Sequence, residues 1–194
     1  MLTSNSKFIL NHVFATEGTI TTVRGEKLDQ LLRFFDTKGE LNIVLAGYVA
    51  EFLGKLMEVY YCEVSKYLFD NPARIEAIVS HLNDLSISKG VVFPLVFKGS
   101  KGIELDTSVL EKKLERENVE NALRPLRMKL LKDIWQRCVH KDDAEYVNNV
   151  MAMFKEAVNV SSKEEKYKAF LFETLYSKFV VNGLFEYMLS TEVD

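Results

Sequence analysis

The sequence predicts an all-α protein, and three observations support this. The chain of 194 residues holds only three prolines and nine glycines, so long stretches run without residues that end helices. No run of strict apolar and polar alternation of strand length stands out. Several segments instead repeat apolar residues every three or four positions, the period of a helix. We expect armadillo- or HEAT-like stacked helices, with an irregular helical bundle as the alternative.

Residues 41–60 predict the central helix of this array. Glu51 and Lys55 interrupt a surface that is otherwise largely apolar. At about 100° per residue, one broad stripe forms. It contains Leu41, Val44, Leu45, Tyr48, Val49, Phe52, Leu53, Leu56 and Met57. Gly47 and Gly54 share the far side, where missing side chains would let a second helix approach closely. We therefore expect an interior helix that neighbours cover on two faces.

Two helices are expected before this segment. Residues 6–15 predict the first, and the β-branched run Ile20–Val23 in the following loop predicts a short extended piece. Glu26–Asp36 carry apolar residues at helical spacing and predict the second helix. Gly39 follows as its stop signal.

Three further helices are expected between the central helix and residue 98. Residues 61–82 predict two short ones, with Asn71 as N-cap and Pro72 at the first helical position, where its missing N–H costs nothing. Leu85–Phe97 predict the third, with a kink or early end at Pro94.

The second half of the chain follows a predicted exposed loop at 99–105, which contains two glycines. The loop separates helical halves 1–98 and 106–194, which we expect to form one continuous domain. Capping-box spacing at Ser108 and Glu111 predicts a charged helix to about residue 118, and a longer helix continues to 140. Pro125 marks the first turn or a kink of that longer helix. The same capping signal recurs at Asp142 with Glu145 and at Ser162 with Glu165.

Composition and charge exclude several classes of protein. The chain is 47% apolar and 27% charged, with a net charge of -3, values typical of ordinary soluble domains. A pI near 5.7 gives no bulk attraction to nucleic acid or anionic membranes. The longest apolar run, Val91–Phe97, is far shorter than the roughly 20 residues that span a bilayer. The first residues lack the apolar core of a secretory signal. We expect no membrane association and an intracellular, cytoplasmic location, with the nucleus as alternative.

Candidate catalytic and metal-binding residues each have a simpler structural interpretation. Cys62 and Cys138 lie far apart in helical patterns and are expected to be buried free thiols. Cys138 and His140 lack the paired spacing of structural zinc sites. His12 and His81 lie on apolar helical faces, where packing is the commoner role. The glycines near 99–102 match no phosphate-binding pattern. We expect no catalytic, cofactor-binding or metal-binding residues and no enzymatic activity.

The stretch from 112 to 141 is rich in basic residues. They are Lys112, Lys113, Arg116, Arg124, Arg127, Lys129, Lys132, Arg137 and Lys141. In helical projection they scatter and are interspersed with acidic residues, which favours a solvated face over a phosphate-tracking stripe. A nucleic-acid partner is therefore disfavoured. Trp135, the one tryptophan, is expected in the core.

Four elements in the middle of the chain form a familiar pattern. They are an LNxxLAGY-like helix at Leu41–Tyr48, the pair Tyr67-Leu68, the segment Pro72–His81, and Ser86-Ile87-Ser88 before a last apolar helix. This pattern resembles the SAPS domain of the regulatory subunits of protein phosphatase 6 and their yeast relatives. Residues 167–190 are more weakly similar to a later helix pair of that family. The chain departs from the family at Pro94 and in the charged block 106–140, and it is much shorter than a complete family domain.

The resemblance implies an armadillo-like scaffold that binds a Ser/Thr phosphatase catalytic subunit and directs it to substrates. It therefore predicts a non-enzymatic regulatory or targeting subunit. It singles out no residues that contact the partner. One alternative is a helical nucleic-acid-binding protein that uses residues 112–141. Another is a small helical enzyme whose pocket is assembled from distant residues.

Overall fold

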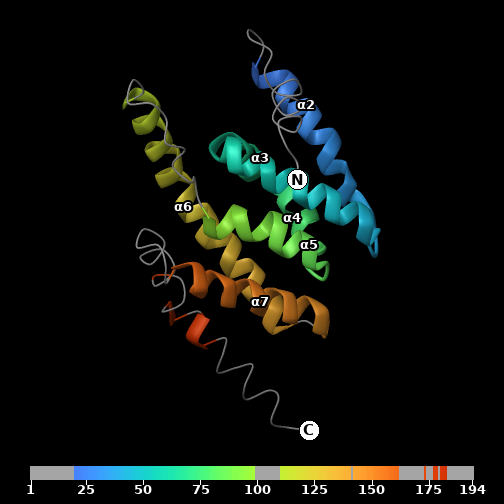
Figure 1. The fold of residues 1–194 in the computed structure, drawn as a ribbon. Helices are drawn as coiled ribbons and strands as arrows, with labels where there is room; N and C mark the ends of the chain where they lie inside the picture. The colour runs from blue at the N-terminus through green and yellow to red at the C-terminus, as the bar shows by residue number, and fades with distance from the viewer. Residues whose placement is uncertain are drawn as a thin grey trace. The chain divides into compact units, whose positions relative to one another are not determined.

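The structure is a computed structural model that describes residues 20–98, 110–140, 142–161, 173, 177–178 and 180–182 (Figure 1). These residues are predominantly helical and include no strand, so the all-α prediction is confirmed for them. The chain divides into two compact units, Met1–Leu41 and Asn42–Asp194. The loop predicted at 99–105, and with it the predicted division of the chain into halves, lies outside the described residues. Among those residues, no helix is both long and apolar enough to cross a membrane.

The first unit contains α2, Ile20–Leu32, which continues into the 3₁₀ helix η1, Arg33–Asp36. Gly39 follows with φ of 96°, a left-handed conformation that glycine adopts without strain, and the predicted stop is confirmed. The extended piece predicted at Ile20–Val23 is wrong, because these residues form the first turn of α2. β-branched residues prefer extended backbone only weakly, and here the helix that continues beyond them overrides that preference.

The second unit begins with the kinked helix α3, Ile43–Asp70. Asn42 caps its start, since the side-chain Oδ1 accepts a hydrogen bond from the Leu45 N–H at 3.1 Å. Tyr60 leaves helical geometry with φ of -124° and ψ of 44°, which kinks the helix there. α4, Pro72–Ser80, then starts at the predicted proline. The side chain of Asn71 instead closes α3, by donating to the Tyr67 carbonyl at 2.6 Å.

One continuous run of short helical pieces forms the centre of this unit. It consists of α5, Leu85–Ile87, and two π-helical pieces, η2, Ser88–Val92, and η3, Pro94–Lys98. Every residue from 91 to 97 is buried. The predicted helix is confirmed, but it does not end early at Pro94. Wider π turns carry the chain through the proline, with the Phe93 N–H bonded to the Ser88 carbonyl five residues back.

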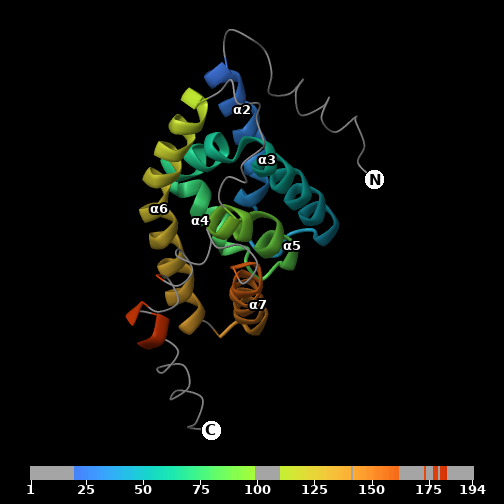
Figure 2. The ribbon, with the colours of Figure 1, turned by 60° about the vertical axis from the view of Figure 1, so that its left-hand side comes forward.

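Helices from both halves of the chain surround this central run (Figures 1 and 2). α3 packs against η2 and η3, α6 (Leu110–Val139) against η3, and α7 (Ala144–Ser161) against η2. In a solenoid, each repeat contacts only its neighbours. A segment contacted by three helices fits the irregular bundle, and armadillo- or HEAT-like stacking is not confirmed.

The C-terminal part of this bundle differs from prediction in two details. α6 is one helix of 30 residues with Pro125 inside, where two helices were expected. Pro125 and Asn121 are both exposed, so water can hydrogen-bond the carbonyl that the proline leaves without a donor. Asp143, not Asp142, caps α7, because its Oδ1 accepts from the Tyr146 N–H at 3.0 Å. The capping residues predicted at 108 and 162 lie outside the described part of the chain.

The aromatic core joins α6, α7 and the central run. Trp135 is buried and packs edge-to-face on Phe154, with ring centroids 5.4 Å apart, and Phe154 packs in turn on Phe97. Asn149 adds polar contacts, since its Nδ2 donates to the carbonyls of Leu82 and Asn83. The core position predicted for Trp135 is confirmed.

The expectation that α3 is covered on two faces is wrong for its first turns. Leu53, Leu56 and Met57 are buried as predicted, but Val44 and Tyr48 of the same stripe are exposed. The Gly54 side lies against the central run, while the opposite side of the first turns faces solvent. Helical periodicity shows which residues share a face, and it does not show whether the chain covers that face. The fully interior segment is instead residues 91–97.

Candidate functional site

The first two turns of α3 expose a group of large apolar side chains, here called the α3 patch. It consists of Ile43, Val44, Leu45 and Tyr48, with exposed fractions of 78%, 65%, 53% and 67%. Tyr48 lies four residues from Val44 and three from Leu45, so these three side chains are neighbours on the helix surface. Single exposed apolar residues are ordinary, whereas larger groups of them are typical of interaction sites.

The fully buried positions of the same turns carry only small side chains. Ala46 and Ala50 are buried, with exposed fractions of 0% and 2%, and Gly47 lies beside Ser86. The usual arrangement of a surface helix places large apolar residues inside and polar ones outside. These turns have the large residues outside instead. Burying the α3 patch against a partner would remove apolar surface from water at about 25 cal/mol per Å².

A shallow groove runs beside the α3 patch, between α3 and the π-helical run, and is called the α3 groove. Its volume is about 200 Å³. Ala50, Gly54, Met57, Gly90 and Pro94 supply its mainly apolar, buried or half-buried lining. The groove lies where the two backbones come closest, since neither glycine places a side chain there.

Charged side chains border the groove. On the α3 side, Lys55 Nζ lies 2.8 Å from Glu58 Oε2, and this hydrogen bond raises the pKa of the lysine. Glu51 lies one turn earlier on the same side. Lys89 contributes a positive charge from η2. With Lys55 and Glu58 compensating each other, the α3 side has a net negative charge and the η2 side a positive one.

A buried polar network lies at the Tyr61 end of the groove. Tyr61 donates its hydroxyl proton to the Leu95 carbonyl at 2.9 Å and accepts from Arg127 Nη1 at 3.2 Å. Arg127 is only 6% exposed, and Glu120 lies 4.0 Å from it. Burial raises the pKa of Tyr61, and the arginine charge opposes that shift. The network joins α3 just after its kink to the π-helical run just after Pro94.

The candidate residues for catalysis and metal binding do not converge. Cys138 is buried, and desolvation raises the pKa of its thiol to about 11, whereas His140 is exposed. Cys62 is half-buried, so the prediction of full burial is wrong for it, because its helix position lies at the edge of the packed face. His81 is buried in the turn after α4, while His12 lies outside the described residues. Among the residues described, no three His, Cys, Asp or Glu side chains form a group able to hold a metal ion.

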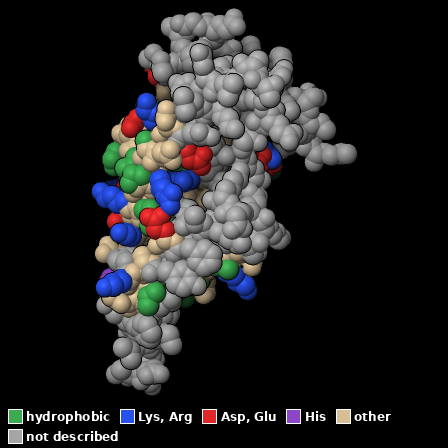
Figure 3. Space-filling model, turned by 90° about the vertical axis from the view of Figure 1, so that its left-hand side faces the viewer, with side chains coloured by type: hydrophobic (Ala, Val, Ile, Leu, Met, Phe, Trp, Pro, Cys, Tyr) green, Lys and Arg blue, Asp and Glu red, His purple; other side chains and the backbone are tan. Residues whose placement is uncertain are grey.

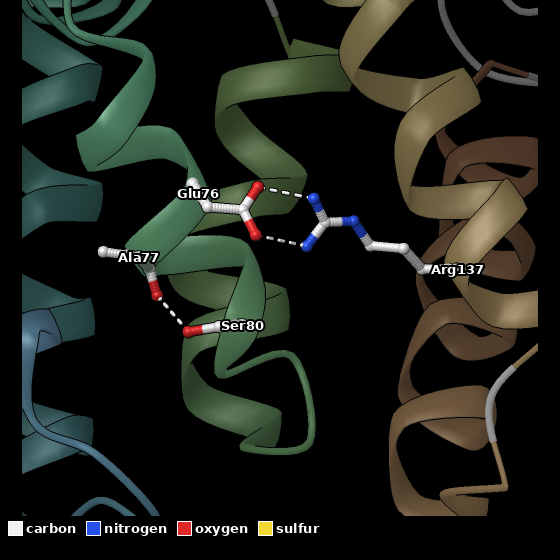
Figure 4. A network of polar contacts seen from close by, with 4 residues as sticks. All are labelled: Glu76, Ala77, Ser80 and Arg137. Atoms are coloured by element: carbon white, nitrogen blue, oxygen red, sulfur yellow. Dashed lines mark hydrogen bonds and ion pairs between the residues drawn. The ribbon is translucent and has the colours of Figure 1, made fainter.

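Three arginines of α6 make contacts within the protein. Arg127 is buried, Arg124 pairs with Glu173, and Arg137 holds Glu76 of α4 through two hydrogen bonds of 2.7 and 2.5 Å (Figure 4). Figure 3 views the side on which α6 lies, where Lys and Arg side chains are interspersed with Asp and Glu. Among the described residues, this distribution is typical of a salt-bridged surface.

Comparison with protein-family models, curated proteins and solved structures gave no match. The resemblance to the SAPS family therefore stays a prediction.

Proposed function

We propose that this protein is a non-enzymatic helical adaptor that binds another protein through the α3 patch. The observation that carries the proposal is the inverted arrangement of the first turns of α3, with alanines inside and Ile43, Val44 and Tyr48 outside. The sequence-based argument from an interior, two-sided helix no longer supports an adaptor, because these turns are exposed. The exposed patch replaces it as the physical basis.

The composition of the patch favours a protein partner. Interface centres are enriched in aromatic and aliphatic residues and surrounded by a polar rim. Tyr48 is an aromatic residue beside aliphatic Val44 and Leu45, and Asn42 and Glu51 adjoin the patch as exposed polar residues. Tyrosine is among the residues that contribute most binding free energy per side chain.

The partner that we propose is a protein phosphatase 6-type Ser/Thr catalytic subunit. This assignment comes from the SAPS-like pattern, whose first element, Leu41–Tyr48, contains the whole α3 patch. One of the four elements of the resemblance therefore also carries the exposed apolar surface. A scaffold of this kind would place the phosphatase near its substrates without contributing catalytic groups.

A pull-down with the immobilised chain tests the proposal. We expect the purified catalytic subunit to be retained by the natural sequence and lost with Val44→Asp and Tyr48→Asp. Leu126→Asp, at an exposed leucine of α6, is the matched control and should retain it. Circular dichroism checks that each variant stays helical. No retention by the natural sequence would exclude this partner, and equal retention by all variants would exclude the patch.

A further inference from the structure

The α3 groove is too small for a cofactor and matches a single side chain. Small-molecule pockets enclose roughly 300–1,000 Å³, and the groove has about 200 Å³. Its inner lining is apolar, made by Ala50, Gly54 and Met57 of α3 with Gly90 and Pro94 opposite. A shallow, mainly apolar groove of this size near an exposed apolar patch can receive one projecting side chain of a partner.

The charges at the rim restrict what can surround that residue. The α3 side carries Glu51, Glu58 and Lys55, so it keeps a net negative charge although Lys55 is hydrogen-bonded to Glu58 at 2.8 Å and also attracted to Glu51. Lys89 makes the η2 side positive. A complementary segment would place a Lys or Arg toward α3 and an Asp or Glu toward η2.

We propose that the groove receives one large apolar side chain, such as Phe or Leu, from a protein segment that carries a basic residue on one side of it and an acidic residue on the other. The proposal rests on the adaptor function above and identifies the part of the partner that docks next to the α3 patch. Insertion of this side chain fixes the position of the partner, and the rim charges select its orientation.

The groove itself is tested without any partner, by NMR of the full chain with labelled Ala and Met methyl groups. The probe is N-acetyl-L-phenylalaninamide, and N-acetylglycinamide is the control that lacks the side chain. We expect saturable shifts at Ala50 and Met57, with a Kd of about 1–10 mM for so small a ligand. Met153, buried in α7, is the control reporter and should not shift.

Two results of this titration would overturn the proposal. One is no saturable shift at either groove methyl up to about 20 mM, twice the upper end of the expected Kd range. The other is an equal shift at Met153, which would show unspecific binding. Neither result depends on the phosphatase, so the groove can fail while retention of the catalytic subunit stands.

The proposed charge complementarity at the groove rim is tested by measuring the affinity of the catalytic subunit for charge-reversal variants. The double reversal Glu51→Lys with Lys89→Glu keeps the net charge and should weaken binding about 3- to 10-fold, as expected for charge pairs at an interface rim. The matched control is Glu145→Lys with Lys155→Glu, at exposed positions of α7, and should leave the affinity unchanged. Unchanged affinity in the first variant, with Tyr48→Asp still abolishing retention, would overturn the proposed basic and acidic residues of the docking segment. The adaptor function would remain intact.

Discussion

A methyl group built on Gly54 would lie 3.0 Å from the carbonyl oxygen of Gly90, so α3 and the π-helical run meet almost backbone to backbone. A methyl group on Gly90 would lie closer still to α3, at 2.9 Å from Ala50 Cβ. Both neighbours are attached directly to the backbone and cannot rotate away. The close approach predicted from the spacing of Gly47 and Gly54 is therefore present at Gly54.

The first prediction is that Gly90→Ala lowers the free energy of unfolding by about 1–3 kcal/mol, the usual cost of overpacking a core. Urea denaturation followed by circular dichroism measures it. Gly47→Ala is the matched control, because its new methyl would meet only Ser86 Oγ at 4.0 Å. We expect this control to be neutral or to stabilise by up to about 1 kcal/mol, since alanine loses less entropy in a helix. Equal stability of the two variants would contradict the close packing.

The fold was predictable where local chemistry decides it. Pro72 acts locally through its missing N–H, and Gly39 acts locally through its positive φ. The helix start at Pro72 and the helix stop at Gly39 were therefore predicted correctly. The course of the chain at Pro94 was not predictable, because burial of residues 91–97 on several sides holds the helix together where the proline alone would end it. Pro125 shows the opposite case, in which exposure to water makes a proline tolerable inside α6.

The second prediction concerns Tyr61 and Arg127. Tyr61→Phe removes the hydroxyl that links Arg127 Nη1 to the Leu95 carbonyl and should lower the free energy of unfolding by about 1–3 kcal/mol. Arg127→Met replaces the buried charge by an apolar chain of similar length and should cost less in the Tyr61→Phe background than alone. A double-mutant cycle from chemical denaturation measures the coupling, and additive effects would show that the two residues act separately.

The third prediction uses the Glu76 and Arg137 pair. Arg137 lowers the pKa of the Glu76 carboxyl, chiefly through their hydrogen bonds. A lowered folded-state pKa gives stability that is present above the ordinary glutamate value of 4.5 and is lost as pH falls through the lowered value. Because both side chains are substantially exposed, Glu76→Gln should cost only about 0.2–1 kcal/mol at pH 7. The difference from the natural protein should shrink toward pH 3 in thermal denaturation. A difference that stays constant with pH would contradict the ion pair.

The fourth prediction is that Cys138 resists thiol reagents in the folded protein. Burial raises its pKa to about 11, so almost no thiolate is present at pH 8. Labelling with iodoacetamide and peptide mapping should modify Cys62, which is half-buried, before Cys138. In urea both should react at similar rates. Faster labelling of Cys138 in the folded state would show that α6 opens locally.

The candidate site was predictable only in part. Helical spacing correctly predicted that Val44, Leu45 and Tyr48 share one apolar stripe. It could not show that the N-terminal end of this stripe is exposed. The sequence feature that could have indicated this is the pair of small residues Ala46 and Ala50, which lie on the side where another segment packs closely. No local sequence pattern indicated that Arg127 is buried, because its partner Tyr61 is 66 positions away in the sequence.

The most direct test of the adaptor account is the affinity of the protein phosphatase 6-type catalytic subunit for Tyr48→Ala, measured by isothermal titration calorimetry beside Leu126→Ala. Tyr48 is 67% exposed and Leu126 40% exposed, so we expect Tyr48→Ala to lower the free energy of unfolding by no more than about 0.5 kcal/mol and Leu126→Ala by no more than about 1.5 kcal/mol, with both variants still folded. We predict at least a tenfold weaker Kd for Tyr48→Ala, about 1.4 kcal/mol, and an unchanged Kd for Leu126→Ala. Equal affinities for both variants and the natural protein would contradict the central claim that the α3 patch binds the partner.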